Sequence, residues 1–256
     1  MEFNVNNTFF TGKFLLHLPS VDSTNDYAKE YMAKSSPIDG TVILADEQLA
    51  GRGQAGNFWL SEANRNLTFS LIYHTAFLRA QEQFYLNMAI SLGLQSFVNK
   101  QVESGNYKTV IKWPNDILAN EKKIAGILIE NTISGVQMKY SVIGIGLNVN
   151  QTMFPAAINA TSLNLLLAKE YDRNKMLNEL LSFLEKYFFL LKKRKFDLLK
   201  KEYLGNLYRF NFEATYIKAG KEFKGIITDV NESGNLIMET KNGIEKFGFK
   251  EISFVI

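Results

Sequence analysis

The sequence predicts an α+β domain over residues 1–208, followed by a small all-β domain over residues 209–256. Two observations support this division. Up to about residue 208, short apolar segments rich in β-branched residues alternate with segments of helical periodicity. Beyond residue 210, short apolar segments follow one another with only turn signals between them, which is typical of a small barrel of the SH3-like kind.

The first domain begins with a predicted strand at Phe14–Pro19 and a helix in "DSTNDYAKEYMA". Ser23 followed three residues later by Asp26 has the form of a capping box, and the apolar residues after it recur at helical spacing. The run Thr41–Ala45 in "GTVILADEQ" is largely apolar and rich in β-branched residues. We expect it to be a strand in the core of the domain.

The rest of this domain is predicted from the same two periodicities. Strands are expected in "NLTFSLIYH" and in "TVIKWP", which ends at Pro114, and the turn "ANEKK" then forms a hairpin into "KIAGILIEN". A Gly-containing turn at Ser134–Gly135 leads to the strand "KYSVIGIGLNV". Helices are expected in "EQFYLNMAISLGLQSFVNK" and, as a long amphipathic helix, over Met176–Leu191.

The C-terminal domain is predicted from four segments, "EATYIKA", "EFKGIITDV", "LIMET" and "IEKFGF". The turn signals "KAGK", "NESGN" and "KNG" separate them. The basic stretch "LLKKRKF" before this domain is expected to be the solvated end of a helix, where cations are favoured, rather than a nucleic-acid patch.

The composition excludes several function classes. The net charge of +3 is too mild to indicate a nucleic-acid binder, and the chain contains no cysteine for a disulfide, a thiol nucleophile or a zinc–thiolate site. The two histidines, His17 and His74, are too few for a multi-histidine metal site. Because the N-terminus lacks a secretory pattern and no apolar run reaches the ~18 residues of a membrane span, we expect a cytoplasmic, non-membrane protein.

The loop "GRGQAGNFW" at Gly51–Trp59 is the first candidate for chemistry. Glycine-rich turns can direct several backbone amides at one anion, and Arg52 can add paired donors. The loop is not a Walker A motif, because no Lys-Ser/Thr follows, and it does not open a helix as the dinucleotide fingerprint does. A phosphate-binding loop and a plain surface turn both remain open on these residues alone.

Three further blocks carry candidate polar residues. In "KWPNDILANEKKIAGILIE", Pro114 presents Lys112, Asn115 and Asp116 at the end of a strand, although this block alone favours a surface hairpin with a charged tip. The glycines of "IGIGLNVN" either leave room for a ligand or allow close sheet packing. The block "DSTN" is a helix cap that can also contact a polar ligand.

Taken in order, "DSTN", "EQLAGRGQAGNFW", "NLTFS", "KWPND", "KKIAGILIE" and "GIGLNVN" resemble the biotin–protein ligase family over roughly residues 14–150. The resemblance implies a mixed sheet flanked by helices, of the class II synthetase-like kind, with an SH3-like C-terminal domain. It also implies the family's reaction, in which biotin and ATP give biotinyl-5′-AMP and pyrophosphate. A lysine of a biotin carboxyl carrier protein then takes the biotin and releases AMP, with Mg²⁺ accompanying the ATP.

The resemblance also assigns roles to individual residues. It implies catalytic roles for Arg52, Lys112, Asp116 and Lys123. The implied biotin contacts are Ser23, Thr24, Gln48, Gly51, Arg52, Gly126, Leu128 and Gly144. The implied contacts to ATP and the adenylate are Arg52, Gly53, Trp59, Lys112, Asn115, Lys123 and Asn148.

Three departures from the family pattern qualify these expectations. Where many members carry basic residues in the glycine loop, this chain has Gln54, Ala55 and Asn57, so we expect it to hold its adenylate less tightly. "SEANRNL" lacks a glycine that members often have, and Asn64 can replace it because asparagine tolerates left-handed backbone angles. The "DSTN" block begins at residue 22, which leaves no room for the DNA-binding domain of some members, and no DNA partner is expected.

Alternatives from other classes remain open. A lipoate or octanoate ligase or transferase of the same superfamily would share much of the pattern. A binding module that uses the small barrel for nucleic acid is a different class, and salt-dependent affinity would reveal it. Either a monomer or a homodimer fits the sequence.

Overall fold

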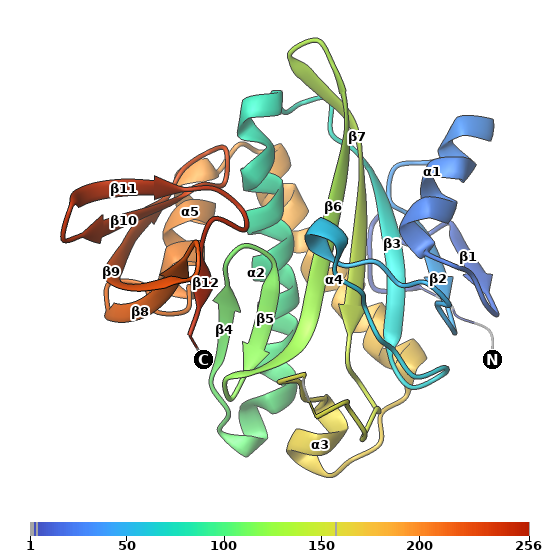
Figure 1. Ribbon diagram of the computed structural model, residues 1–256. Helices are drawn as coiled ribbons and strands as arrows, with labels where there is room; N and C mark the ends of the chain where they lie inside the picture. Colours follow the sequence, from blue (N-terminus) through green and yellow to red (C-terminus); the bar gives the residue numbers. More distant parts are fainter. Residues whose placement is uncertain (1–2, 4, 157, 256) are drawn as a thin grey trace.

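The centre of the molecule is a mixed sheet. In the computed structural model, which describes residues 3, 5–156 and 158–255, its seven strands run in the order β1-β2-β3-β7-β6-β5-β4 (Figure 1). Only β1 and β2 pair in parallel, and the other neighbours are antiparallel. The strands are β1 (Leu15–Leu18), β2 (Thr41–Ala45), β3 (Leu67–His74), β4 (Thr109–Lys112), β5 (Asp116–Ala119), β6 (Lys122–Ser134) and β7 (Gln137–Leu147).

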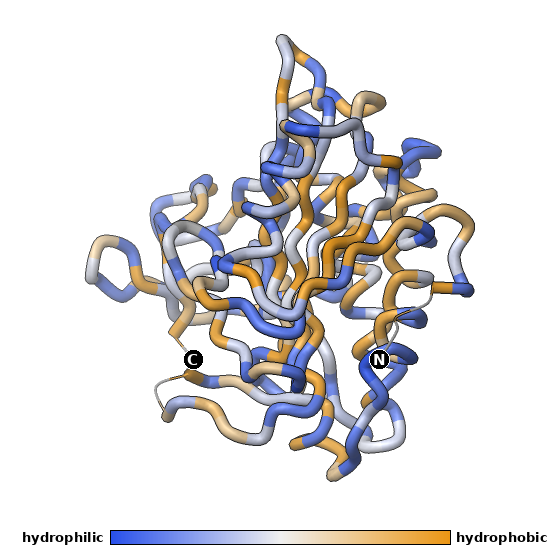
Figure 2. Tube along the Cα trace, turned by 90° about the vertical axis from the view of Figure 1, so that its right-hand side faces the viewer, coloured by the Kyte–Doolittle hydropathy of each residue, from blue (hydrophilic) through white to orange (hydrophobic). Residues whose placement is uncertain are grey.

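Helices cover both faces of this sheet, and the alternation of strand side chains decides which residue meets which helix. On one face Ile43 packs with Ala28 of α1 (Thr24–Lys34). On the other face Leu44 joins the main core beneath α2 (Gln83–Val102) and α4 (Arg173–Lys192). The hydrophobic segments accordingly gather at the centre of the molecule in Figure 2. The mixed sheet flanked by helices is therefore confirmed.

Most of the predicted elements are confirmed. The predicted strand Thr41–Ala45 is β2, and the predicted Ser134–Gly135 turn joins β6 to β7. Ser23 caps α1 by accepting from the backbone N–H of Asp26 at 3.4 Å. Asn64 has φ 61°, so it adopts the left-handed conformation expected of it.

Several short elements had no predicted counterpart. They are α3 (Leu163–Leu167), α5 (Phe196–Gly205), the short strand Ser253–Phe254 and the 3₁₀ turns Gln54–Gly56, Ala80–Glu82 and Glu103–Gly105. The basic stretch "LLKKRKF" does end α4, as expected. It also has a structural contact, because Arg194 pairs with the buried Glu82 at 2.6 Å.

The C-terminal segment forms a five-stranded antiparallel sheet within the described residues. Its strands are β8 (Glu213–Lys218), β9 (Lys221–Val230), β10 (Leu236–Thr240), β11 (Gly243–Phe247) and β12 (Ser253–Phe254), in the order β11-β10-β9-β8-β12. Its core is aromatic, with Tyr216 close to the rings of Phe223 and Phe254. This agrees with the predicted small SH3-like unit, whose boundary at residue 208 stays a prediction.

This unit is fastened to the first one next to β4. The Trp113 indole nitrogen donates to the Gly234 carbonyl at 2.9 Å, and the Trp113 ring lies 5.4 Å from that of Phe249. Figure 1 shows β12 and the C-terminus beside β4. The end of the chain therefore reaches the edge of the main sheet that carries "KWPND".

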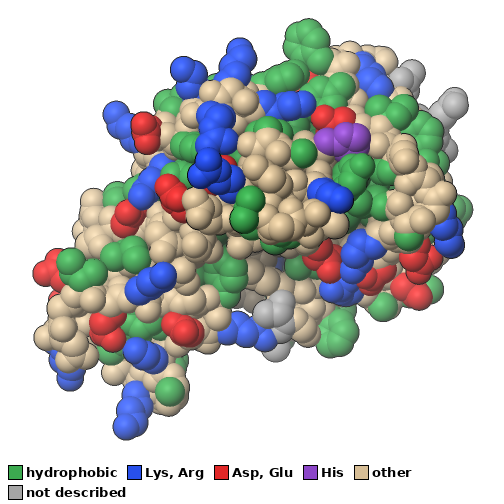
Figure 3. Space-filling model, turned by 90° about the horizontal axis from the view of Figure 1, so that it is seen from above, with side chains coloured by type: hydrophobic (Ala, Val, Ile, Leu, Met, Phe, Trp, Pro, Cys, Tyr) green, Lys and Arg blue, Asp and Glu red, His purple; other side chains and the backbone are tan. Residues whose placement is uncertain are grey.

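The molecular surface shows no single basic band from above. Lysine and arginine side chains are spread over this face and lie among carboxylates (Figure 3). Among the described residues, no helix combines the length and the apolar character that crossing a membrane requires.

Glu185 of α4 anchors the N-terminal segment and generates a stability prediction. Its buried carboxylate accepts from the backbone N–H groups of Phe9, Phe10 and Thr11 at 2.7–2.9 Å. Glu185→Ala leaves these donors without an acceptor, at roughly 1–3 kcal/mol for each one buried, so we expect a loss of about 3 kcal/mol or more in urea unfolding. Glu179→Ala on the same helix breaks a partly exposed pair with Lys100 and a hydrogen bond from the Gln101 side chain, and should cost about 1 kcal/mol. Equal losses would contradict this account.

Candidate active site

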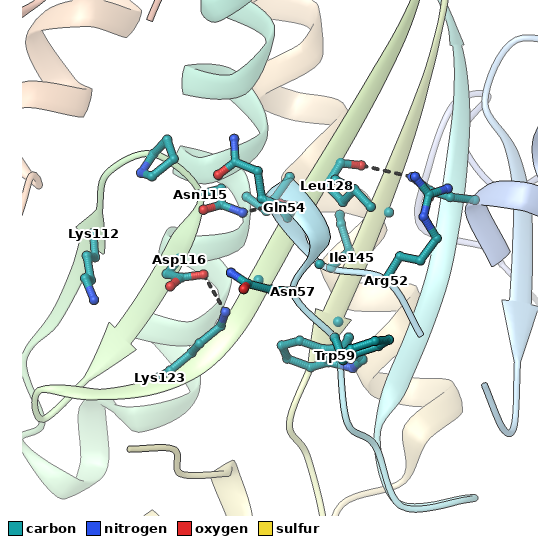
Figure 4. Close-up of a pocket in the computed structure, with 18 of the residues that line it drawn as sticks. Arg52, Gln54, Asn57, Trp59, Lys112, Asn115, Asp116, Lys123, Leu128 and Ile145 are labelled. Carbon is teal, nitrogen blue, oxygen red and sulfur yellow. Dashed lines mark hydrogen bonds and ion pairs between the residues drawn. The ribbon is translucent and has the colours of Figure 1, made fainter. Parts of the chain in front are cut away.

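A cavity of about 510 Å³, here called the main cavity, opens on the α1 face of the sheet (Figure 4). It gathers residues from α1, the glycine loop, β4 to β7 and the C-terminal unit. Its lining includes Ser23, Thr24, Asn25, Gln48, Arg52, Gly53, Gln54, Asn57, Trp59, Lys112, Asn115, Asp116, Lys123, Gly126, Leu128, Gly144, Gly146, Lys250, Ile252, Ser253 and Phe254.

Two glycines of β7 make the floor of the main cavity. A β-carbon on Gly146 would lie 2.2 Å from the Trp59 ring, and one on Gly144 would lie 2.5 Å from Asn25 Oδ1. The indole and the amide therefore rest directly on the sheet backbone. Glycine is required at both positions because other groups approach the backbone so closely. The glycines of "IGIGLNVN" can therefore serve close packing and a ligand cavity at the same time.

Polar groups without formal charge form one end of the main cavity. Gln48 Oε1 accepts from the backbone N–H of Thr24 at 2.9 Å and from its hydroxyl at 3.0 Å. These bonds fix the Gln48 side chain and leave its amide nitrogen as a donor at the cavity wall. The Ser23 hydroxyl, which accepts from Asp26 N–H as the cap of α1, retains its own proton to donate. This end is suited to a neutral polar group.

Cations gather at the other end. Lys123 Nζ lies 2.6 Å from Asp116 Oδ1, and the two side chains point toward one another in Figure 4. Lys112 stands apart from them and has no ion pair within the described part of the chain. Burial lowers the pKa of Lys112, the charges of Lys123 and Arg209 lower it further, and the attraction of Asp116 opposes the shift. Lys112 is therefore a cation that an incoming anion would stabilise.

Arg52 lines the main cavity but is held at its rim by carboxylates. Its guanidinium contacts Asp26 Oδ1 at 2.5 Å and Glu130 Oε1 at 3.1 Å. Lys29 contacts the same two oxygens at 2.7 and 2.9 Å. Partial burial would raise the pKa of both carboxyls, but the bonds and charges of Lys29 and Arg52 hold them below their ordinary values. If Arg52 turns to another anion, Lys29 still contacts both carboxylates.

The aromatic side of the main cavity is built by Trp59. Lys123 Nζ lies 5.6 Å from its ring, and its indole nitrogen is buried with no hydrogen-bond partner among the described residues. Asn148 is also buried, with its amide nitrogen donating to Thr161 O at 3.0 Å and its Oδ1 lacking a described partner. Two buried polar atoms therefore lack a hydrogen-bond partner among the described residues, and one of them belongs to Trp59 in the cavity lining.

The structure brings most of the candidate residues together. Gly51 and Asn148 are the exceptions, because they are buried next to the main cavity without lining it. Asn115 lines it but also clamps β6, since its side chain donates to Ile127 O at 2.7 Å and its carbonyl accepts from Ile127 N–H at 3.0 Å.

Sequence reasoning missed several residues of this site. Asn25 donates to Glu130 at 2.8 Å and to Leu128 O at 3.3 Å, so it ties α1 to β6. Both Asn25 and Glu130 stand inside the quoted motifs "DSTN" and "GILIE", which were the available signal. The C-terminal residues Lys250 and Phe254 leave no such signal, because their contribution depends on a contact between distant segments.

Comparisons with known proteins agree with this geometry. The model of the biotin/lipoate A/B protein ligase family matches residues 17–148. The bifunctional ligase/repressor BirA of Bacillus subtilis is 32% identical over 243 residues, which cover 92% of this chain and 72% of that protein. A biotin–[acetyl-CoA-carboxylase] ligase of Mycobacterium tuberculosis is 30% identical over 217 residues, covering 85% of this chain and 80% of that protein.

A solved structure shows the same arrangement over nearly the whole chain. The biotin protein ligase of Aquifex aeolicus in complex with biotin and ATP superposes with a TM-score of 0.76 at 28% identity. The match covers 94% of this chain and 98% of that one. The similarity therefore includes the C-terminal unit as well as the main sheet.

The environment of Lys112 predicts that its charge lowers the stability of the folded protein. Lys112→Met removes a partly buried cation, so we expect Tm at pH 7.5 to rise by up to about 2 °C, with solvent contact keeping the gain small. Lys112→Arg keeps the charge and should show no gain. Because the native state releases this proton first as pH rises, wild-type stability should approach that of the Met variant toward pH 10. A lower Tm for Lys112→Met, measured by calorimetry, would contradict this.

Proposed function

The chain belongs to the biotin/lipoate A/B protein ligase family and is a ligase, and from this premise we propose that it attaches biotin to a lysine of a biotin carboxyl carrier protein. One observation carries the proposal. A neutral hydrogen-bonding end and a cationic end share one cavity over a glycine floor. A ligand with an uncharged polar ring system and a carboxylate tail fits such a polarity, and it can meet a nucleotide at the cationic end.

Biotin is proposed to lie on the floor with its ring system toward α1. The ureido group has a carbonyl that accepts and N–H groups that donate, which suits the Ser23 hydroxyl and the Gln48 amide. Gly126 and Leu128 of β6 and Gly144 of β7 line the cavity beneath this position. Thr24 then acts by orienting Gln48 through its two hydrogen bonds.

In the first step, a carboxylate oxygen of biotin attacks the α-phosphorus of ATP and pyrophosphate leaves. Both reactants are anionic, so cations must screen them and hold an in-line geometry. Lys112 and Lys123 line the site where they would meet, and Arg52 can turn inward from its carboxylates. Gly53 allows the loop backbone to approach the phosphate closely.

The nucleotide base is proposed to stack on Trp59. An exocyclic amino group can donate to the buried Oδ1 of Asn148, which lacks a described partner. Mg²⁺ would enter with the triphosphate as part of the substrate, and phosphate oxygens and water are its preferred ligands. Among the described residues there is no cluster of three or more His, Cys, Asp or Glu, so the ion would depend on the nucleotide for its ligands.

In the second step, the acceptor lysine amine attacks the carbonyl of the mixed anhydride and AMP leaves. We assign Asp116 the removal or positioning of the amine proton, since it lies in the main cavity and pairs with Lys123. Lys123 pairs with Asp116 and can at the same time contact the phosphate. Neutral Gln54 stands in the loop beside this site, which supports the proposal that the adenylate is held less tightly.

The proposed function is tested by incubating the protein with biotin, ATP and a biotin carboxyl carrier domain. We expect biotin-dependent ATP–pyrophosphate exchange and a mass gain of one biotinyl group on a single lysine of the carrier. Lipoate or octanoate with a lipoyl domain is the control for the related superfamily activity. Exchange with those acids and not with biotin would replace the proposal by that activity.

Arg52 is predicted to act in adenylation and not in folding. Its ion pairs are half exposed, so Arg52→Ala should change Tm by no more than about 2 °C. Loss of a cation at the reacting phosphate should reduce ATP–pyrophosphate exchange by about 10²–10³-fold. Arg65→Ala, which breaks comparable exposed pairs with Glu62 and Glu170, is the matched control and should exchange normally. Normal exchange with a large loss of Tm in Arg52→Ala would refute the assignment.

A further inference from the structure

A second, smaller cavity of about 100 Å³ adjoins the main one and has no role in the steps above. We call it the side cavity. Four residues line both cavities: Gln54, Asn115, Ile127 and Leu128. The other residues around the side cavity are Gln83, Phe84, Asn87, Ile129, Asn131, Ser233 and Phe249.

The side cavity lies around the edge of β6, toward the other face of the sheet. The pairing of β6 with β5 ends at Gly126, and Asn115 clamps the next residue, Ile127. Beyond this clamp the β5 side of β6 has no partner strand among the described residues. Ile129 of this open stretch packs against the α2-side core, opposite to the floor residue Leu128. The two cavities therefore meet at the edge of β6, where Asn115 lines both and precedes Asp116 of the cationic end in the chain.

The lining of the side cavity differs chemically from that of the main cavity. It contains no charged residue among the described ones that surround it, although amide side chains come from three separate elements. Asn131 Nδ2 donates to Gln83 Oε1 at 3.1 Å, so two of these amides hold each other in place. The main cavity, by contrast, contains Lys112, Lys123 and Asp116. A cationic or anionic group thus finds an ion-pair partner in the main cavity only.

We propose that the side cavity receives the side chain of the acceptor lysine, as the alkylamine that attacks the adenylate. The inference rests on the proposed function and adds the route by which the second substrate arrives. The lysine nitrogen forms a bond to the carbonyl carbon of the mixed anhydride, the bond from that carbon to the phosphate oxygen breaks, and AMP leaves. The proton released by nitrogen goes to the Asp116 carboxylate.

Size, charge and position support this assignment. A cavity of about 150 Å³ holds benzene, so about 100 Å³ is suited to the thinner four-carbon stem of lysine. A neutral lining gives the amine no carboxylate that would keep it protonated, and only the free amine is a nucleophile. Exposed Ser233 and half-exposed Phe249 place the mouth of the side cavity at the surface of the C-terminal unit.

A charge placed in the side cavity provides the first test. Gln83→Glu introduces a carboxylate that would keep the amine protonated, whereas Gln83→Met has similar length and no charge. Each full-length variant is assayed for biotin-dependent ATP–pyrophosphate exchange and for transfer to the carrier domain. We expect exchange within twofold of wild type in both, and a loss of at least tenfold in the kcat of transfer for Gln83→Glu only. Equal transfer by the two variants would overturn the proposal.

A steric block provides the second test. Asn87→Trp fills the side cavity from α2, and Asn99→Trp places the same side chain at an exposed position near the other end of that helix. Selective loss of transfer in Asn87→Trp supports the route. Unchanged transfer, or loss of exchange and transfer together, overturns it. Absence of exchange in the wild-type protein is a different result, because it refutes the proposed function itself.

Discussion

The bare backbone of β7 at Gly144 and Gly146 is the constraint on which the site depends. Both faces of the main sheet are covered by helices, and a covered face normally fills with side chains. These positions lack a β-carbon, and the space goes instead to Asn25 and to the Trp59 indole, which approach within distances that a β-carbon would forbid. The loop that carries Trp59 can therefore close onto the sheet. Without that contact, neither Arg52 nor Gln54 would lie at the cavity.

The second constraint is the gathering of cations in a partly buried place. Each one repels the others, and the structure offsets this in different ways. Lys123 is paired with Asp116, and Arg52 shares two carboxylates with Lys29. Lys112 has no ion pair within the described chain, and burial, together with the charges of Lys123 and Arg209, lowers its pKa. The charges of Lys123 and Arg52 are thus balanced by carboxylates within the protein, and a bound phosphate would offer both cations an alternative anionic partner.

The sequence predicted those parts of this design that are local. The strand Thr41–Ala45 and the capped helix after Ser23 have complete patterns within a few residues, and both are confirmed. The motifs also indicated most of the cavity lining, including Lys112 and Gly126. Contacts between distant segments could not be predicted from the sequence. An example is Lys112 Nζ, which lies 5.5 Å from the centre of the Phe254 ring. No periodicity records the direction of a flexible side chain either, so the rim position of Arg52 required coordinates.

The edge of β6 links these constraints to the chemistry. A ligase that forms a reactive adenylate must exclude water from it and still admit a second nucleophile. One opening for both substrates would expose the adenylate whenever the nucleophile entered. Here the pairing between β5 and β6 ends at Gly126, and Asn115 covers the next residue of the β6 edge with two hydrogen bonds at Ile127. The side cavity beside this point has an uncharged lining, which suits a deprotonated lysine side chain. Because β5 is short, the main cavity and the side cavity lie next to each other at the edge of β6, and the proposed second substrate has an approach that is separate from the main opening.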